Sequence, residues 1–193
     1  MTLEGRIDHG ALAEAWSEYA TSRHWQCGTL VWRADSLAAT QGEPATVRRA
    51  KALNAVLTHC PLTVMPGELL VGLGNLGRWV AEGTCTQERL AQAQAQVWEF
   101  GERDFQSHAN HHAPDYATLL RLGFGGLREQ VAASWPQQDA KGRLFLESVR
   151  LALEGATAYL RRWAACLGTT AQEFPGKGPL LRGQAAMLAR LAD

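Results

Sequence analysis

The stretch FLESVRLALEGATAYLRRWA, residues 145–164, decides the fold class. Its apolar and small residues recur at spacings of three and four, which is the periodicity of one face of an α-helix. That face comprises Phe145, Val149, Ala152, Ala156, Tyr159, Leu160 and Trp163. The register holds for about five turns, and Gly168 lies just beyond it. We therefore expect a long amphipathic helix that ends near this glycine.

Upstream, the same periodicity predicts a second helix in QGEPATVRRAKALNAVLTHCP, residues 41–61. Pro44 suits the first helical turn, and the proline at the end of the stretch stops the run. The segment that follows, PLTVMPGELLVGLGNLG (61–77), has β-prone runs on both sides of a Pro-Gly dipeptide, which favours a turn. We therefore expect a short extended or β segment near 62–72.

Three more helices are indicated downstream. An Ala- and Gln-rich run from Thr86 to about Phe105 is weakly amphipathic. Another helix begins near Pro114 and ends before Trp135. Its apolar face comprises Tyr116, Leu119, Leu120, Phe124, Leu127 and Val131. The final run, GPLLRGQAAMLARLAD (178–193), begins a helix within which the chain stops, and an ending without a stop signal favours a cut or degenerate chain.

Length and charge limit the classes of function. The chain has 193 residues, 46% of them hydrophobic, and 19 basic residues balance 19 acidic ones. We expect one mainly helical domain over residues 1–193, with no net field that would draw it to nucleic acid or an anionic membrane. There is no leader-like N-terminus and no apolar run of the roughly 18 residues that span a bilayer, so we expect a cytoplasmic protein. Cys27, Cys60, Cys85 and Cys166 are scattered without a C-x-x-C pair, as expected for reduced thiols.

Three histidines gather in SHANHHAPDYATLLRLGFGGL, residues 107–127. His108 and His112 are four apart, a spacing at which a helix could place two metal ligands side by side. Pro114 weakens that reading, because it disfavours helical backbone just before it and so leaves the histidines in the loop that precedes a helix. A polar loop, a catalytic or substrate-binding histidine and a metal site all stay open on spacing alone. Histidine titrates near neutrality and can polarise a hydroxyl.

Three segments, taken together, resemble the N-terminal part of glycyl radical enzymes. This pyruvate formate-lyase-like family includes glycerol, propanediol and 4-hydroxyproline dehydratases and choline lyase. EPATVRRAKALNAVLTHCPLTVMPGELLVG (43–72) is similar to the family's arginine-bearing helix and its "P-I-x-I-x-x-x-E-L-I-V-G" stretch. HHAPDYATLLRLGFGGLREQV (111–131) is similar to "G-H-x-x-x-D-Y-x-x-V-L-x-x-G-x-x-G-I", and 145–164 to a third family helix. The segments occur in the family's order over about 29–165.

The resemblance places His111 at the family histidine, four residues before Asp115. In the diol and hydroxyproline dehydratases that histidine lies at the substrate hydroxyls and helps a hydroxyl leave, which makes His111 the candidate catalytic and substrate-binding residue. His108 and His112 would be its neighbours, with no assigned role. From the residues themselves, we expect Asp115 to cap a helix and Tyr116 to begin the buried face.

Other charged residues of these segments have structural interpretations. Arg48 and Arg49 are expected to be helix-surface or ion-pairing groups, and Glu68 is expected to brace the turn before it. The sequence also departs from the family pattern. Asn110 stands where the family has glycine, and relatives carry an insertion in the region between Gly77 and Thr86.

The family's radical chemistry needs two loops that this sequence does not contain. The thiyl-forming cysteine belongs to "G-C-x-E" and the radical glycine to "R-V-x-G-[YF]". In this chain Cys85 stands three residues before Glu88 with different flanks, and Gly183 lacks the valine and the aromatic residue. In relatives both loops, and the ten-stranded barrel, lie far beyond residue 193. The resemblance thus implies the helical N-terminal portion of such an enzyme, with the barrel absent.

We therefore expect a fragment or split portion of a glycyl-radical lyase or dehydratase of anaerobic metabolism, which acts on a small hydroxylated substrate and is not catalytically complete alone. The resemblance implies no cofactor bound by this chain. In the complete enzyme it implies a glycyl radical, installed by an activase with S-adenosylmethionine and an iron-sulfur cluster. The implied partners are the barrel portion or another glycyl radical enzyme chain, the activase, and a second copy. The alternative is a free-standing, non-catalytic helical protein that binds partners.

Overall fold

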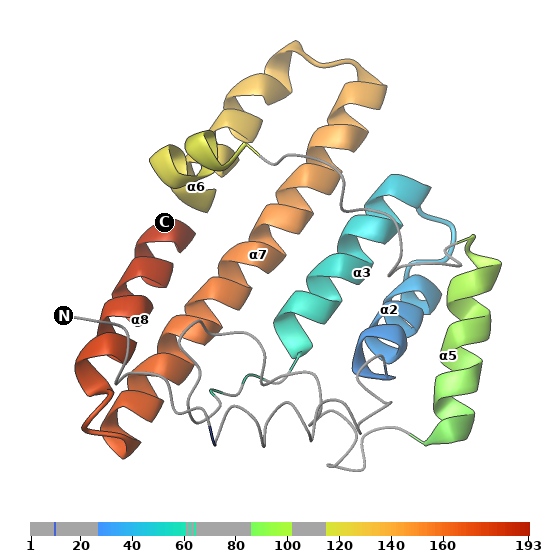
Figure 1. Cartoon of the computed structure of the whole chain (residues 1–193). Helices are drawn as coiled ribbons and strands as arrows, with labels where there is room; N and C mark the ends of the chain where they lie inside the picture. The colour runs from blue at the N-terminus through green and yellow to red at the C-terminus, as the bar shows by residue number, and fades with distance from the viewer. Residues whose placement is uncertain (1–9, 11–26, 61, 63, 65–85, 102–114) are drawn as a thin grey trace.

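A computed structural model describes residues 10, 27–60, 62, 64, 86–101 and 115–193. The described part of the chain is built from helices (Figure 1), so the expected mainly helical fold class is confirmed. The elements are α2 (Cys27–Ala39), α3 (Ala45–His59), α5 (Gln87–Glu99), α6 (Tyr116–Ser134), the 3-10 helix η3 (Trp135–Gln137), α7 (Ala140–Glu173) and α8 (Gly178–Ala192). Of the expected extended segment near 62–72, Leu62 and Val64 lie in neither helix nor strand, and the other residues lie outside the described ones.

The helices lie side by side in a row. Figure 1 shows the order α8, α7, α3, α2, α5, and each helix of this row packs against the next. The remaining long helix, α6, packs against α7 and α8. Helix α7 contacts α3, α6 and α8, so it is the central helix of the described part of the chain.

Helix α7 is longer than the sequence periodicity predicts. It runs for 34 residues, about 50 Å, and continues past Gly168 to Glu173, so the expected end near that glycine is wrong. An interior glycine costs a helix only about 1 kcal/mol relative to alanine. Burial outweighs this cost, because Leu167 and Ala171 on either side of the glycine pack with Leu181 of α8 in a fully buried cluster.

A second apolar cluster holds the other end of the row. Helix α2 contributes Ala34 and Leu37, α3 contributes Ala52, and α5 contributes Ala93 and Val97, all of them buried. Three of these five side chains are alanines, which lets the helix backbones approach one another closely. The cluster therefore fixes α2 between α3 and α5.

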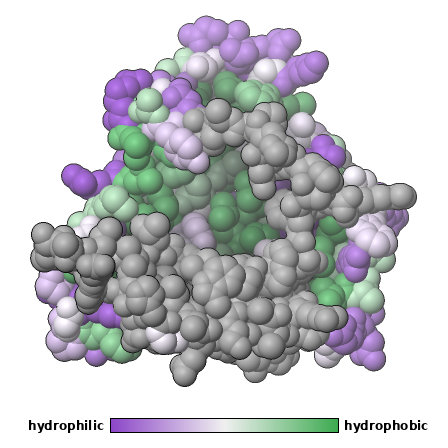
Figure 2. Space-filling view, viewed as in Figure 1, coloured by the Kyte–Doolittle hydropathy of each residue, from purple (hydrophilic) through white to green (hydrophobic). Residues whose placement is uncertain are grey.

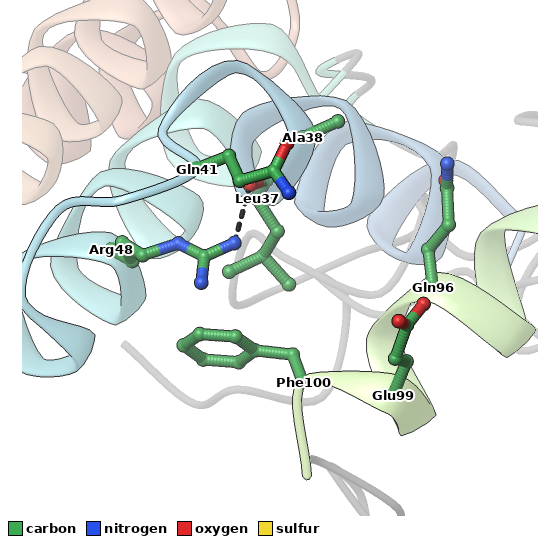
Figure 3. A pocket seen from close by; sticks show the side chains of 7 residues that line it. All are labelled: Leu37, Ala38, Gln41, Arg48, Gln96, Glu99 and Phe100. Carbon is green, nitrogen blue, oxygen red and sulfur yellow. Dashed lines mark hydrogen bonds between the residues drawn. The ribbon is translucent and has the colours of Figure 1, made fainter.

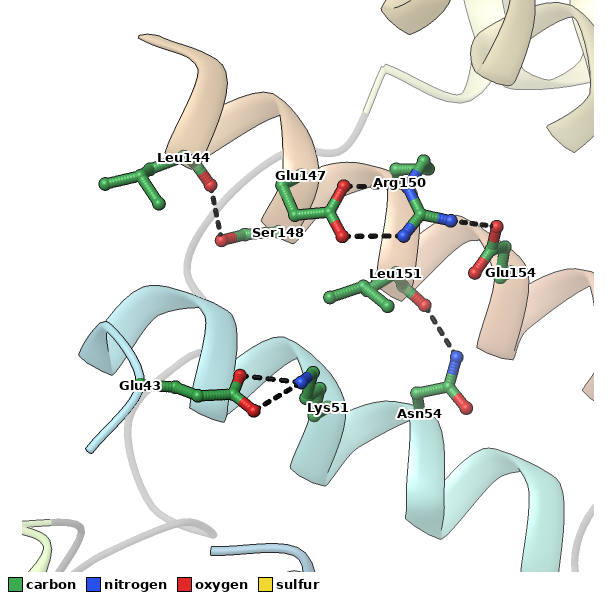
Figure 4. A network of polar contacts seen from close by, with 9 residues as sticks. All are labelled: Glu43, Lys51, Asn54, Leu144, Glu147, Ser148, Arg150, Leu151 and Glu154. Carbon is green, nitrogen blue, oxygen red and sulfur yellow. Dashed lines mark hydrogen bonds and ion pairs between the residues drawn. The ribbon is translucent and has the colours of Figure 1, made fainter. Parts of the chain in front are cut away.

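Between these two clusters, α3 and α7 are joined by a close backbone contact and a polar one. A Cβ built on Gly155 would lie 2.9 Å from Cα of Asn54. The Asn54 side-chain amide donates to the carbonyl of Leu151, 2.8 Å away (Figure 4). Along α7, Arg150 pairs with Glu147 and Glu154, and its hydrogen bonds lower the pKa of Glu147.

The C-terminal end of α3 is capped from α7. Arg162 donates to the carbonyl of Leu57, 2.8 Å away, and to the carbonyl of Cys60. These carbonyls lie at the C-terminal end of α3. Carbonyls at a helix end have no backbone N–H of the same helix to accept from. Burial raises the pKa of the Cys60 thiol, although the arginine beside it acts in the opposite direction. Cys60 is therefore a protonated packing residue at neutral pH.

The Gly155 contact makes a testable prediction about stability. Gly155→Ala should lower the free energy of unfolding by about 1–3 kcal/mol, because the added methyl group must push α3 away from α7. The matched control is Gly168→Ala on the same helix, where a Cβ would meet nothing within 4 Å. That variant should raise stability by about 0.5–1 kcal/mol. Urea denaturation followed by circular dichroism measures both, and equal effects of the two substitutions would contradict the close packing.

Candidate functional site

The three sequence-predicted histidines, His108, His111 and His112, fall in residues 102–114, outside the described part of the chain. The description resumes at Asp115, which begins α6. The Asp115 carboxylate accepts a hydrogen bond from the backbone N–H of Thr118 at 3.0 Å. The predicted helix start and the capping role of this aspartate are therefore confirmed, and the histidine segment leads directly into a fixed helix terminus.

The hydrogen bond from Thr118 also sets the ionisation of the cap. It lowers the pKa of the Asp115 carboxyl below its ordinary value, and Arg121 in the next turn acts in the same direction. A carboxylate at this end of the helix also faces the positive end of the helix dipole. The group is therefore ionised at neutral pH.

Helix α6 does not have the continuous buried face that its sequence suggests. Tyr116 is 61% exposed and Leu120 is 73% exposed, so the expectation that Tyr116 begins a buried stripe is wrong. The reason is a kink at Gly123, whose φ of 64° and ψ of −178° are accessible essentially to glycine alone. The kink changes the helical phase, so apolar residues before and after it no longer share one face.

The glycines of α6 also form its contact with α8. Gly123 and Gly125 are the buried residues of α6. A Cβ on Gly125 would clash with the backbone oxygen of Asp193, and one on Gly123 would lie 3.1 Å from the carbonyl of Leu191. Arg161 of α7 forms an ion pair with Asp193 at 2.7 Å. The small residues thus pack α6 against α8, while Tyr116 and Leu120 of α6 stay exposed.

Exposed large apolar side chains also occur on α7. At the start of α7, Phe145 is 63% exposed and Leu144 is 41% exposed. Further along α7, the predicted apolar positions Val149, Ala152, Ala156, Tyr159 and Leu160 are only half-buried. Figure 2 shows apolar residues gathered in a hollow on the face of the row seen in Figure 1. The four exposed side chains, Tyr116 and Leu120 of α6 with Leu144 and Phe145 of α7, are grouped under the name α6–α7 apolar surface.

Arg48 is neither a surface group nor part of an ion pair among the described residues, so that expectation is corrected. It is half-buried, and its Nη2 donates to the carbonyl of Leu37 at the end of α2, 2.6 Å away. The guanidinium lies over the ring of Phe100, 4.4 Å from its centroid. Helix α2 ends in carbonyls that need donors, and Arg48 supplies one from α3. Arg49 is exposed, as expected, with its guanidinium 5.4 Å from the same ring.

Beside Arg48 lies a pocket of about 330 Å³ between α2, α3 and α5 (Figure 3). It is lined by Leu37, Ala38, Gln41, Arg48, Gln96, Glu99 and Phe100. The volume is at the lower end of the range for small-molecule sites, about 300–1,000 Å³. Sequence reasoning missed this pocket, because its polar side chains come from α3, α5 and the turn after α2 and share no local spacing.

A buried arginine of α2 was also not anticipated. Arg33 is 2% exposed, and burial lowers its pKa to about 10. This value is still well above neutrality, so the side chain stays cationic inside the helix row.

Other chemical groups of the described residues are dispersed. No three His, Cys, Asp or Glu side chains of the described part come together in a way that could hold a metal ion. Gly183 lies inside the regular helix α8, and Cys85 lies outside the described residues. Within the described ranges, no helix has the length and apolar character needed to cross a membrane.

Sequence comparison gives one family. A family model described as pyruvate formate lyase-like matches residues 77–176, just over half of the chain. The match spans α5, α6 and α7 together with the histidine segment. No curated protein matches the chain.

Solved structures resemble the chain in fold. A structure from Roseburia inulinivorans, described in terms of 1,2-propanediol dehydration, has a TM-score of 0.69 at 20% identity and covers 86% of this chain and 27% of that one. The glycerol-bound B12-independent glycerol dehydratase of Clostridium butyricum has a TM-score of 0.67 at 18% identity, covering 96% and 31%. A glycyl radical enzyme from Archaeoglobus fulgidus has a TM-score of 0.58 at 21% identity, covering 86% and 28%. The chain thus spans less than a third of each of these proteins.

The cap of α6 predicts how stability depends on pH. Because folding lowers the pKa of Asp115, the stabilisation from its charge is present above the ordinary aspartate pKa of about 3.9 and is lost as pH falls through the lower folded-state value. Asp115→Asn keeps an acceptor but removes the charge. It should lower the thermal midpoint slightly near pH 7 and leave it unchanged at acid pH, whereas Asp115→Ala should lower the neutral-pH midpoint further. Thermal unfolding measured from neutral to acid pH checks this pattern. A difference in thermal midpoint between the Asp115→Asn variant and the parent that is the same at every pH would contradict it.

Proposed function

Because the chain belongs to the pyruvate formate lyase-like family, we propose that it is the helical N-terminal portion of a glycyl radical dehydratase or lyase acting on a small hydroxylated substrate. The observation that carries this proposal is the fold match. Between 86% and 96% of the chain superposes on less than a third of solved glycyl radical enzymes, which include a glycerol dehydratase. The proposal assigns the rest of the catalytic machinery to sequence outside these 193 residues.

His111 is the residue of this chain that we assign to the reaction. It lies four residues before the capped start of α6, inside the segment matched by the family model. A histidine near neutrality can donate a proton to a hydroxyl as the carbon–oxygen bond breaks, which turns a poor leaving group into water. The fixed helix start at Asp115 supports this assignment, because His111 lies only four residues from it in the sequence.

The radical step itself is not assigned to this chain. In the complete enzymes of the family, a glycyl radical made by an activase supplies the hydrogen-atom chemistry. The sequence around Cys85 and Gly183 does not match the loops that carry this chemistry, and the backbone of Gly183 is helical. The residues present therefore do not fit the radical-bearing group, and the proposal places it on the barrel portion.

The α6–α7 apolar surface supports a docking role in the same proposal. Exposed aromatic and leucine side chains on α6 and the start of α7 resemble the half of a core that another layer completes. We assign the barrel portion of the enzyme to this surface. The same observation favours a second candidate function, a free-standing non-catalytic protein that binds a partner there.

Turnover of the complete enzyme distinguishes the two functions. In the enzyme assembled from this chain and its barrel portion, His111→Ala should lower dehydration of 1,2-propanediol or glycerol by about 100-fold or more, as expected for loss of an acid–base group. His108→Ala is the matched control from the same segment and should leave turnover within about twofold, because no catalytic contact is assigned to it. Circular dichroism of both variants monitors folding. Equal activity of the His111 variant and the parent would remove His111 from the site, and an inactive parent assembly would favour the second function.

Docking has its own test. Leu120→Glu places a charge on the α6–α7 apolar surface and should weaken binding of the barrel portion about tenfold or more. It should change the stability of the chain by less than about 0.5 kcal/mol, because Leu120 is exposed. Glu129→Gln, at an exposed polar position of the same helix, is the control. Isothermal titration calorimetry measures both affinities, and unchanged binding by the Leu120 variant would place the interface elsewhere.

A further inference from the structure

The pocket between α2, α3 and α5 presents opposite charges that do not pair with each other. Arg48 and Glu99 both line it, and Figure 3 shows them on opposite sides. Neither side chain has an ion-pair partner among the described residues. A direct salt bridge between an accessible arginine and glutamate would contribute only a small energy. Here the two charges are held apart by an accessible space.

Arg48 is held rigidly at its side of the pocket. Its Nη2 donates to the Leu37 carbonyl at 2.6 Å, and its Nε donates to the Thr40 hydroxyl at 3.4 Å. The Phe100 ring covers one face of the guanidinium. Guanidinium has five N–H donors in a planar fork, so these contacts leave donors along the edge of the group for an incoming acceptor. A guanidinium that is already ordered loses little entropy when it binds a carboxylate.

The opposite side of the pocket suits a cation. The Glu99 side chain projects from the last turn of α5, and the Gln41 side chain extends toward the same space from the turn after α2 (Figure 3). A carboxylate is an acceptor only, and an amide can donate or accept. Leu37 and Ala38 supply apolar lining between the charged groups. The arrangement therefore offers donors at one end, acceptors at the other and a short apolar wall between them.

We propose that this pocket binds a small zwitterion of the amino acid class, with the ligand carboxylate on Arg48 and the ligand ammonium on Glu99. A simple anion would satisfy Arg48 and leave the ligand beside the Glu99 carboxylate, which repels it. A simple cation would face the guanidinium in the same way. A molecule that carries both charges satisfies both sides of the pocket, and its carbon skeleton fits the volume of about 330 Å³. The site does not depend on the proposed function.

A series of small ligands tests whether the pocket requires both charges. The same series shows which separation between carboxylate and ammonium it prefers. Glycine, β-alanine and 4-aminobutyrate carry the two charges at increasing separation, and acetate and methylammonium carry one charge each. Binding to the full chain is measured by NMR titration. At least one amino acid should bind about tenfold tighter than either single-charge probe, because it gains a second charge-assisted hydrogen bond. Acetate that binds as tightly as the best amino acid would overturn the proposal and reduce the site to an anion contact of Arg48.

Two substitutions on α5 locate the binding. Glu99→Gln should weaken the best amino acid about tenfold and leave acetate unweakened, because only the ammonium contact is lost. Glu88→Gln is the matched control, an exposed glutamate in the first turn of the same helix and outside the pocket lining, and should leave both affinities unchanged. Both sites are exposed, so both variants should fold as the parent does. An amino acid affinity that is equal in the two variants would falsify the assignment of Glu99.

Discussion

The close packing of α3 on α7 at Gly155 is the constraint on which the helix row depends. Two buried clusters hold the row, one around α2 and α5 and the other between α7 and α8, and they share no helix. The α3–α7 contact joins these two halves. Gly155 allows the helix backbones to touch, and the Asn54 amide and the Arg162 guanidinium add hydrogen bonds between α3 and the α7 side of the contact. Of these, only Arg162 reaches carbonyls at a helix end, those of Leu57 and Cys60.

Local sequence signals predicted the elements whose termini are set by their own residues. Pro44 precedes α3, Thr86 caps α5 by accepting from Arg89, and Asp115 caps α6, and all three starts follow from the sequence. The end of α7 does not follow from the sequence. Burial of Leu167 and Ala171 against α8 outweighs the helix-weakening effect of Gly168 between them. Helix α2 has no counterpart among the expected helices. Its buried positions, Ala34 and Leu37, gain their significance only from α3 and α5, which lie next to it in space.

The candidate site also contains features that local sequence predicts and features that depend on other parts of the fold. The cap at Asp115 is a local feature and was predictable, whereas the exposure of Tyr116 depends on the Gly123 kink. A strict helical count cannot detect a kink that a single glycine permits, since the spacing of apolar residues on each side is still helical. The role of Arg48 was missed for a related reason. Its partners, the Leu37 carbonyl and the Phe100 ring, belong to two other helices, so nothing in its own helix distinguishes it from Arg49.

The arrangement of the described helices is the basis on which we propose a further layer. Helical domains bury their apolar faces between at least two layers, but the described helices lie largely in one row, and the central helix α7 keeps several apolar residues half-buried. The deeply buried residues of the row are mainly alanines and a few leucines and valines, which stabilise contacts between neighbouring helices. The aromatic residues Phe145 and Tyr116 point outside those contacts. Large apolar side chains contribute most to stability when they are covered, and for this reason we assign the proposed docking to the exposed side chains of α6 and α7.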